Sequence, residues 1–135
     1  MKFYISAKWQ MKDVVSEMVS LILYEGHEVP VDWTKRAFDR DYENFDLSSK
    51  YAKEEIDAIL ESDVFIHLTD VKGIGKYIDL GCALANVTLN GKPEIYIIGE
   101  KANESQFYFH PKINRIVGDP IKSLDTIILP NINKK

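Results

Sequence analysis

Cysteine is nearly absent from the sequence, because Cys82 is the single cysteine among 135 residues. One cysteine cannot form an intrachain disulfide or a cysteine-based zinc site. Proteins without disulfides are typical of reducing compartments, so we expect a cytoplasmic location. Cys82 lies in a helix-like segment beside small residues, where a buried core position is a more frequent role than that of a nucleophile.

An excess of positive charge is also missing. The 17 Lys and Arg residues are outnumbered by 21 Asp and Glu residues, which gives a formal net charge of -4. A negative protein repels nucleic acid polymers and anionic membranes. No apolar run approaches the roughly 20 residues of a membrane span, and the first residues lead directly into strand-like sequence without a signal-peptide core. We therefore expect neither a nucleic acid polymer nor a membrane as a partner.

Three common ligand-binding motifs are not found. The sequence has no G-x-x-x-x-G-K-[ST] phosphate loop, and Gly73 and Gly75 lack a third glycine at the spacing of a dinucleotide fingerprint. The three histidines are scattered, without the spacing of a zinc site. The sequence thus predicts no metal and no cofactor.

The residues that are present describe a globular protein. Hydrophobic residues make up 45% of the chain and charged residues 28%, with only 7 Gly and 5 Pro. This balance can bury a core, and the length suits one domain over residues 1–135.

Strand-like and helix-like segments alternate along the chain. Short apolar segments predict β-strands at residues 3–5, 27–33, 63–68, 94–99 and 115–117, with Pro30 placing the second at a sheet edge. Apolar residues at helical spacing predict helices near 14–23, 46–62, 77–90 and 123–129, the second capped by Asp46. Residues 34–45 are expected to be a long connection. The pattern predicts a three-layer α/β/α sandwich, that is, a flavodoxin- or Rossmann-like, doubly wound parallel sheet of about five strands.

Ligands of such sheets bind at the carboxyl ends of the strands. The polar and aromatic residues near those ends include Ser6, Lys8, Trp33 and Asp70. Asp79 follows a glycine turn early in the third predicted helix, where it could face this crevice. The pattern alone fits a solvated helix residue equally well.

Three segments in order carry a family resemblance, namely residues 61–66 (ESDVFI), 73–85 (GIGKYIDLGCALA) and 91–93 (GKP). Together they resemble the nucleoside 2-deoxyribosyltransferase-like family, which includes the deoxynucleoside 5'-monophosphate N-glycosidases. The similarity runs from about residue 2 to residue 99.

The resemblance implies N-glycosidic bond cleavage or transfer on a nucleoside or nucleoside 5'-monophosphate. In the family, a helix carboxylate attacks the sugar C1' atom and expels the base, and Asp79 occupies that position. Glu55 matches a second acidic residue that positions or protonates the reacting groups, and Tyr4 matches a supporting tyrosine. Asp79 is one methylene shorter than the family's Glu, which displaces the carboxylate by about 1.5 Å.

The same resemblance implies a small-molecule partner and a homo-oligomer. Ser6, Lys8 and nearby backbone amides are placed to receive a 5'-phosphate, and Trp9 or Trp33 could stack on the base. The remaining expected substrate-binding residues are Asp70, Gly73 and Gly75. The aromatics at 107–109 are expected to be exposed and could form the interface between copies, although packing against their own sheet fits equally well.

Three other interpretations remain open from the sequence. A non-catalytic nucleotide-binding or sensing module would keep the crevice and lose the catalytic geometry. The carboxylate on a helix also resembles TIR-type domains that cleave the nicotinamide glycosidic bond of NAD. A receiver- or flavodoxin-like module would share only the fold.

Overall fold

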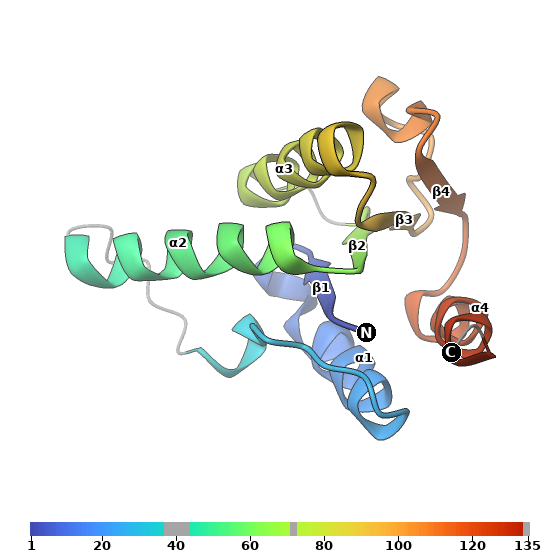
Figure 1. The fold of residues 1–135 in the computed structure, drawn as a ribbon, viewed down its shortest axis with the longest axis horizontal. Helices are drawn as coiled ribbons and strands as arrows, with labels where there is room; N and C mark the ends of the chain where they lie inside the picture. Colours follow the sequence, from blue (N-terminus) through green and yellow to red (C-terminus); the bar gives the residue numbers. More distant parts are fainter. Residues whose placement is uncertain (37–43, 71–72, 134–135) are drawn as a thin grey trace.

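The computed structural model describes residues 1–36, 44–70 and 73–133. Within these residues four parallel strands form one sheet in the order β1-β2-β3-β4 (Figure 1). The strands are β1 (Phe3–Ser6), β2 (Val64–Leu68), β3 (Glu94–Ile98) and β4 (Ile113–Ile116). All carboxyl ends of the strands therefore lie along one edge of the sheet.

Helices cover both faces of this sheet. The first face carries α1 (Lys12–Tyr24) and α4 (Pro120–Asn133), and the opposite face carries α2 (Phe45–Glu61) and α3 (Ile74–Asn90) (Figure 1). Three short 3-10 helices complete the described elements: η1 (Trp9–Met11), η2 (Trp33–Lys35) and η3 (Gln106–Phe109). The predicted α/β/α arrangement is confirmed.

The middle of the sheet is the core of the molecule. Every residue of β2 is buried, as its nearly continuous apolar sequence predicts for a strand covered on both faces. On the sheet face opposite α2 and α3, α1 buries residues that recur at helical spacing, namely Val15, Met18, Val19 and Ile22. The predicted end of α3 is also confirmed, since Gly91 adopts the left-handed conformation with φ 80°.

The predicted strand at 27–33 is wrong. In that segment the structure has a single parallel bridge, between Lys2 and Glu28, and the chain then turns into η2. Pro30 has no N–H to donate to a sheet ladder, and the Asp32 carboxylate accepts from the Thr34 backbone N–H at 3.1 Å, which favours the turn. The described sheet therefore has four strands and not about five. Glu28 lies beside the outer edge of the sheet, next to β1.

Several predicted boundaries also shift. α2 begins after Asn44, whose side chain accepts from Leu47 N at 3.1 Å, so Asp46 lies in the first turn and is not the cap. α3 begins at Ile74 and α4 extends in both directions beyond 123–129. Most of the predicted connection at 34–45 lies outside the described residues, and its first residues belong to η2.

The aromatic segment at 107–109 is only partly exposed. Phe107 and Phe109 are 60% and 53% exposed, whereas Tyr108 is buried. The Tyr108 hydroxyl lies 2.9 Å from His67 Nε2 in the core, so its packing corrects the expected exposure. Homo-oligomer formation stays a prediction.

No helix in the described ranges is long and apolar enough to cross a membrane.

Candidate functional site

Asp79 lies where α3 passes over the carboxyl ends of β1 and β2. α3 begins at Ile74 and is the next described element after β2 along the chain, and Asp79 is in its second turn. Ser6, the last residue of β1, is buried and its Oγ donates to Asp79 Oδ2 at 2.8 Å. Because β1 and β2 are parallel neighbours, both groups reach the same edge of the sheet.

The environment of Asp79 favours its protonated form. The pKa of this carboxyl is raised to about 7, mainly by burial and to a smaller extent by the negative charge of Glu55. The hydrogen bond from Ser6 acts in the opposite direction because it stabilises the carboxylate. The side chain therefore changes charge near neutral pH, as catalytic carboxyl groups often do.

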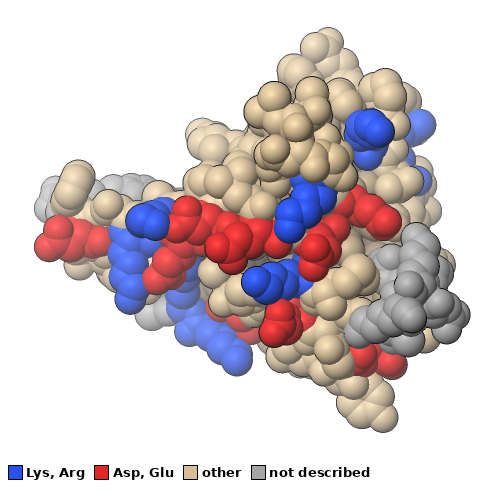
Figure 2. Space-filling model, viewed as in Figure 1, with Lys and Arg blue, Asp and Glu red and all other residues tan. Residues whose placement is uncertain are grey.

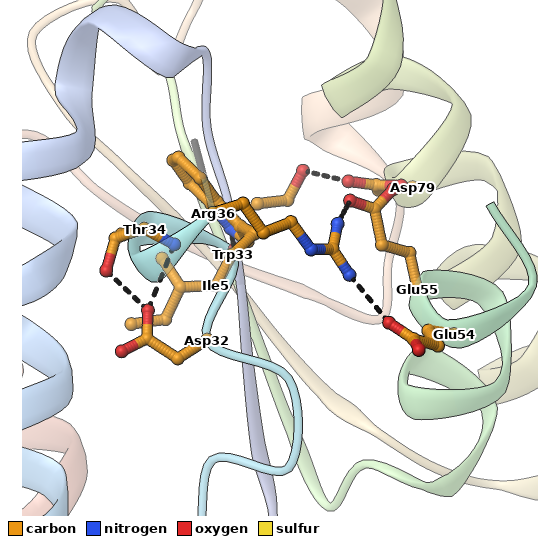
Figure 3. Close-up of polar contacts among 9 residues, drawn as sticks. Ile5, Asp32, Trp33, Thr34, Arg36, Glu54, Glu55 and Asp79 are labelled. Atoms are coloured by element: carbon orange, nitrogen blue, oxygen red, sulfur yellow. Dashed lines mark hydrogen bonds and ion pairs between the residues drawn. The ribbon is translucent and has the colours of Figure 1, made fainter. Parts of the chain in front are cut away.

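Glu55 approaches the same place from α2. Its Oε1 accepts from Arg36 Nη1 at 2.8 Å, and the neighbouring Glu54 Oε2 accepts from Arg36 Nη2 at 3.0 Å (Figure 3). Burial raises the pKa of Glu55, while the charge and hydrogen bond of Arg36 lower that pKa. Glu55 is thus a partly buried carboxylate with a cation on one side and Asp79 within electrostatic range.

Tyr4 completes this group from β1. It is 1% exposed, and its ring stacks on Phe65 with centroids 5.9 Å apart. Burial raises the pKa of the phenol well above its ordinary value, and the charges of Asp79 and Glu55 add to that rise. Tyr4 therefore keeps its proton at neutral pH. The structure brings together the three residues expected to be catalytic, and we call Tyr4, Ser6, Glu55 and Asp79 the carboxylate cluster.

The two tryptophans lie beside β1. Trp33 is buried, and its indole N–H donates to the Ile5 carbonyl oxygen at 2.8 Å. Trp9 is partly exposed, with its ring centroid 6.1 Å from that of Trp33 and with Lys12 Nζ over its ring. Trp33 is therefore anchored in the core, and Trp9 keeps more ring surface accessible to a ligand.

Gly73, the N-cap of α3, lies next to Lys8, and Gly75 belongs to the helix, so the expected glycine turn is corrected to a helix start. A Cβ added at Gly73 would come within 3.2 Å of Lys8 Cγ, so the backbone and the lysine side chain pass closely. A Cβ at Gly75 would meet nothing within 4 Å, which makes this first turn of α3 accessible. These residues lie at the expected edge of the sheet.

Asp70 has a local structural partner. Its Oδ1 accepts from the Glu100 backbone N–H at 2.9 Å and so connects the ends of β2 and β3. Gly99, with φ 141°, has no room for a side chain there, because a Cβ would collide with Thr69 Oγ1 and Asp70 Oδ1.

Lys76 is a feature that the sequence analysis missed. It is 3% exposed, and its Nζ donates to the Leu68 carbonyl oxygen at 3.0 Å. The pKa of Lys76 is lowered to about 8, mainly by burial and also by the charges of Lys101 and Lys8, while the charge of Asp70 acts in the opposite direction. Three lysines thus approach the carboxyl ends of the strands, which favours an anionic ligand.

Arg36 was also missed, together with its partners Glu54 and Tyr51. The sequence offered little signal for it, because Arg36 stands in a segment with several other charged residues and has no periodic pattern.

Among the described residues no group of three His, Cys, Asp or Glu side chains could hold a metal ion.

Comparison with known proteins adds evidence on the fold. No protein-family model and no curated protein matches the sequence. Among solved structures, the CMP N-glycosidase BcmB of Clostridium botulinum is similar, with a TM-score of 0.66 over 94% of this chain and 98% of that chain. The two sequences are 20% identical. The chain therefore has the same α/β fold as a nucleotide N-glycosidase.

Proposed function

We propose that this protein breaks or transfers the N-glycosidic bond of a nucleoside or nucleoside 5'-monophosphate, with Asp79 as the nucleophile. The observation that carries this proposal is the carboxylate cluster at the carboxyl end of the sheet. Its Asp79 is oriented by the 2.8 Å hydrogen bond from Ser6 and is in electrostatic contact with Glu55 and Tyr4. The fold shared with a CMP N-glycosidase supports the same chemistry.

The reaction needs a negative group beneath the sugar. As the bond from C1' to the base nitrogen breaks, positive charge develops on the sugar, and a carboxylate there stabilises that charge. Asp79 forms an ester with C1', while the electron pair of the broken bond goes to the base, which takes a proton from an acid or from water. Water or a second base then attacks C1' and releases Asp79.

The supporting residues have distinct roles in this proposal. Ser6 fixes the rotamer of Asp79 and stabilises its charge. Glu55 serves as an acid/base or positioning group. Tyr4 keeps its proton and can donate a hydrogen bond toward developing negative charge.

A phosphorylated substrate suits the charge at this edge. Lys8, Lys76 and Lys101 act on one another electrostatically near the strand ends, and below about pH 8 Lys76 carries its charge. Trp9 supplies a partly exposed ring on which a base can stack. We therefore place nucleoside 5'-monophosphates first among the substrates to test.

The test is chromatographic detection of free base. The purified protein is incubated with ribonucleosides, deoxyribonucleosides, their 5'-monophosphates and NAD, alongside Asp79→Ala and the isosteric Asp79→Asn. Base released by the wild type and by neither variant supports the proposal and identifies the substrate class. If no substrate releases base at high enzyme concentration, the proposal fails, and nucleotide binding that survives Asp79→Ala would then indicate a non-catalytic binding module.

A further inference from the structure

Arg36 joins η2 to α2 through a forked contact. Its two terminal nitrogens bind different carboxylates, Nη1 to Glu55 Oε1 at 2.8 Å and Nη2 to Glu54 Oε2 at 3.0 Å. The guanidinium also lies over the Tyr51 ring, with Cζ 3.9 Å from the centroid. The two ion pairs, which Figure 3 shows, and the stacked Tyr51 ring together fix the planar group.

Other ion pairs on α2 differ from this one. Figure 2 shows acidic and basic side chains gathered along the exposed face of α2. There Lys53 pairs with Asp57, and these side chains are 78% and 51% exposed. The Arg36 side chain is only 16% exposed and that of Glu55 31%. Exposed pairs contribute little, whereas a partly desolvated fork has a fixed geometry.

The segment that carries Arg36 is itself anchored. Trp33 is hydrogen-bonded to β1 through the Ile5 carbonyl, and the Asp32 side chain accepts from the Thr34 backbone N–H. η2 is therefore fixed to the strand that also carries Tyr4 and Ser6. Arg36, at the end of η2, reaches from this strand to α2.

Glu55 is surrounded by charged and titratable groups from each element packed around it. Arg36 comes from η2, Glu54 from α2 itself, Asp79 from α3 and Tyr4 from β1. Burial and Glu54 raise the pKa of Glu55, and Arg36 is the group that lowers it. Charge on Glu55 in turn raises the pKa of Asp79. Arg36 therefore favours the ionised form of Glu55, and ionised Glu55 favours the protonated form of Asp79.

We propose that Arg36 is a positioning residue, which holds the Glu55 carboxylate toward Asp79 so that Glu55 accepts a hydrogen bond from the substrate and does not donate its proton. The group recognised would be a hydroxyl of the sugar or an N–H of the base. This role in turnover rests on the proposed glycosidic function, while the effect of Arg36 on Glu55 does not.

Three variants test the proposal. Arg36→Met removes the charge and keeps much of the side-chain length, and Arg36→Lys keeps the charge and loses the fork. Lys53→Met is the matched control, because it removes an exposed cation paired with another carboxylate on the same helix. Thermal melts check that each variant is folded. If Arg36→Met does not fold, Arg36→Lys still tests the proposal.

The first measurement does not require turnover. Carboxyl ¹³C chemical shifts of Glu55, assigned with Glu55→Gln, are followed against pH. We expect the pKa of Glu55 to rise in Arg36→Met, to rise less in Arg36→Lys and to stay unchanged in Lys53→Met. An unchanged pKa of Glu55 in Arg36→Met would overturn the proposal.

The second measurement is the pH profile of base release. We expect Arg36→Met to lower kcat/KM by about 10 to 100-fold, which is the cost of a misplaced group. The limb of the pH profile that depends on ionisation of Glu55 should also move to higher pH. Partial rescue by Arg36→Lys supports the role, and an equal loss in Lys53→Met contradicts it. If the wild type releases no base, the proposed function fails, and the titration alone decides the effect of Arg36 on Glu55.

Discussion

Two buried polar groups lie under the first turns of α3, and burial affects them in opposite ways. The carboxylate cluster contains two acids whose pKa values are raised chiefly by burial, and the charge of Glu55 adds to the rise at Asp79. The second group is His67 with Tyr108, whose side chains are 2.9 Å apart. Burial, with the charge of Lys76, lowers the pKa of His67 to about 3, so this ring is neutral.

The difference corresponds to two roles of buried polar residues: one group stabilises the fold, and the other is proposed to take part in chemistry. His67 is neutral at physiological pH, and the contact between its Nε2 and the Tyr108 hydroxyl connects β2 to η3. The carboxylate cluster instead contains a group that changes charge near pH 7. Perturbed acids facing one another at the edge of a parallel sheet are characteristic of active sites. The predictions below test this contrast.

The largest effect is expected from Asp79→Ala. Loss of the nucleophile should reduce base release by about 10³-fold or more, as removal of a nucleophile does in other enzymes. Initial rates of base release measure it. A variant that keeps wild-type turnover would show that the carboxylate cluster is not the reacting centre.

The pH dependence of turnover comes next. As the proposed nucleophile, Asp79 must be ionised to attack, and its pKa is raised to about 7. We expect kcat/KM to rise about tenfold per pH unit below that pKa and to level off above it. A pH–rate profile of the wild type tests this, and a flat profile between pH 5 and 7 would contradict it.

Asp79→Asn should also change stability in a pH-dependent manner. The pKa of Asp79 in the folded protein, about 7, lies above its ordinary value of 3.8, so folding is favoured when Asp79 is protonated. The wild type therefore loses this contribution as pH rises from 4 through 7. The neutral amide should be more stable than the wild type at pH 8, by up to a few kcal/mol, with little difference at pH 4. Thermal melts at both pH values measure this.

Tyr108→Phe should give the smallest effect. It removes one hydroxyl and leaves His67 Nε2 without its partner in the core, which costs about 1 to 3 kcal/mol of unfolding free energy. Denaturant unfolding measures the loss. Base release should stay within about twofold of the wild type when the variant is folded. A large loss of turnover without loss of stability would remove the distinction between the two groups.

Most of the fold could be predicted because it depends on local patterns. The apolar run at β2, the helical spacing in α1 and the glycine that ends α3 each indicated their element directly. The structure of the segment at 27–33 could not be predicted from its local pattern. It has strand-like residues, but Pro30 and the side chain of Asp32 favour a turn over further pairing with β1.

The candidate site was predicted only in part. Asp79, Glu55 and Tyr4 were found by resemblance to a family, and the structure places them together. Lys76 and Arg36 were not found, because a lysine in a helix and an arginine in a charged segment ordinarily face solvent. Their burial depends on the carbonyl of Leu68 and on the carboxylates of α2.

The sequence by itself determined the order of strands and helices, except for the strand wrongly predicted at 27–33, and the residue types that follow each strand. These properties follow from propensity and periodicity, which act over a few residues. Only the tertiary structure decided which side chains meet: Ser6 and Asp79 are 73 residues apart in the chain, His67 and Tyr108 are 41 apart, and Arg36 and Glu55 are 19 apart. Burial and charge at such contacts, which set the pKa values, exist only once the sheet has brought the segments together.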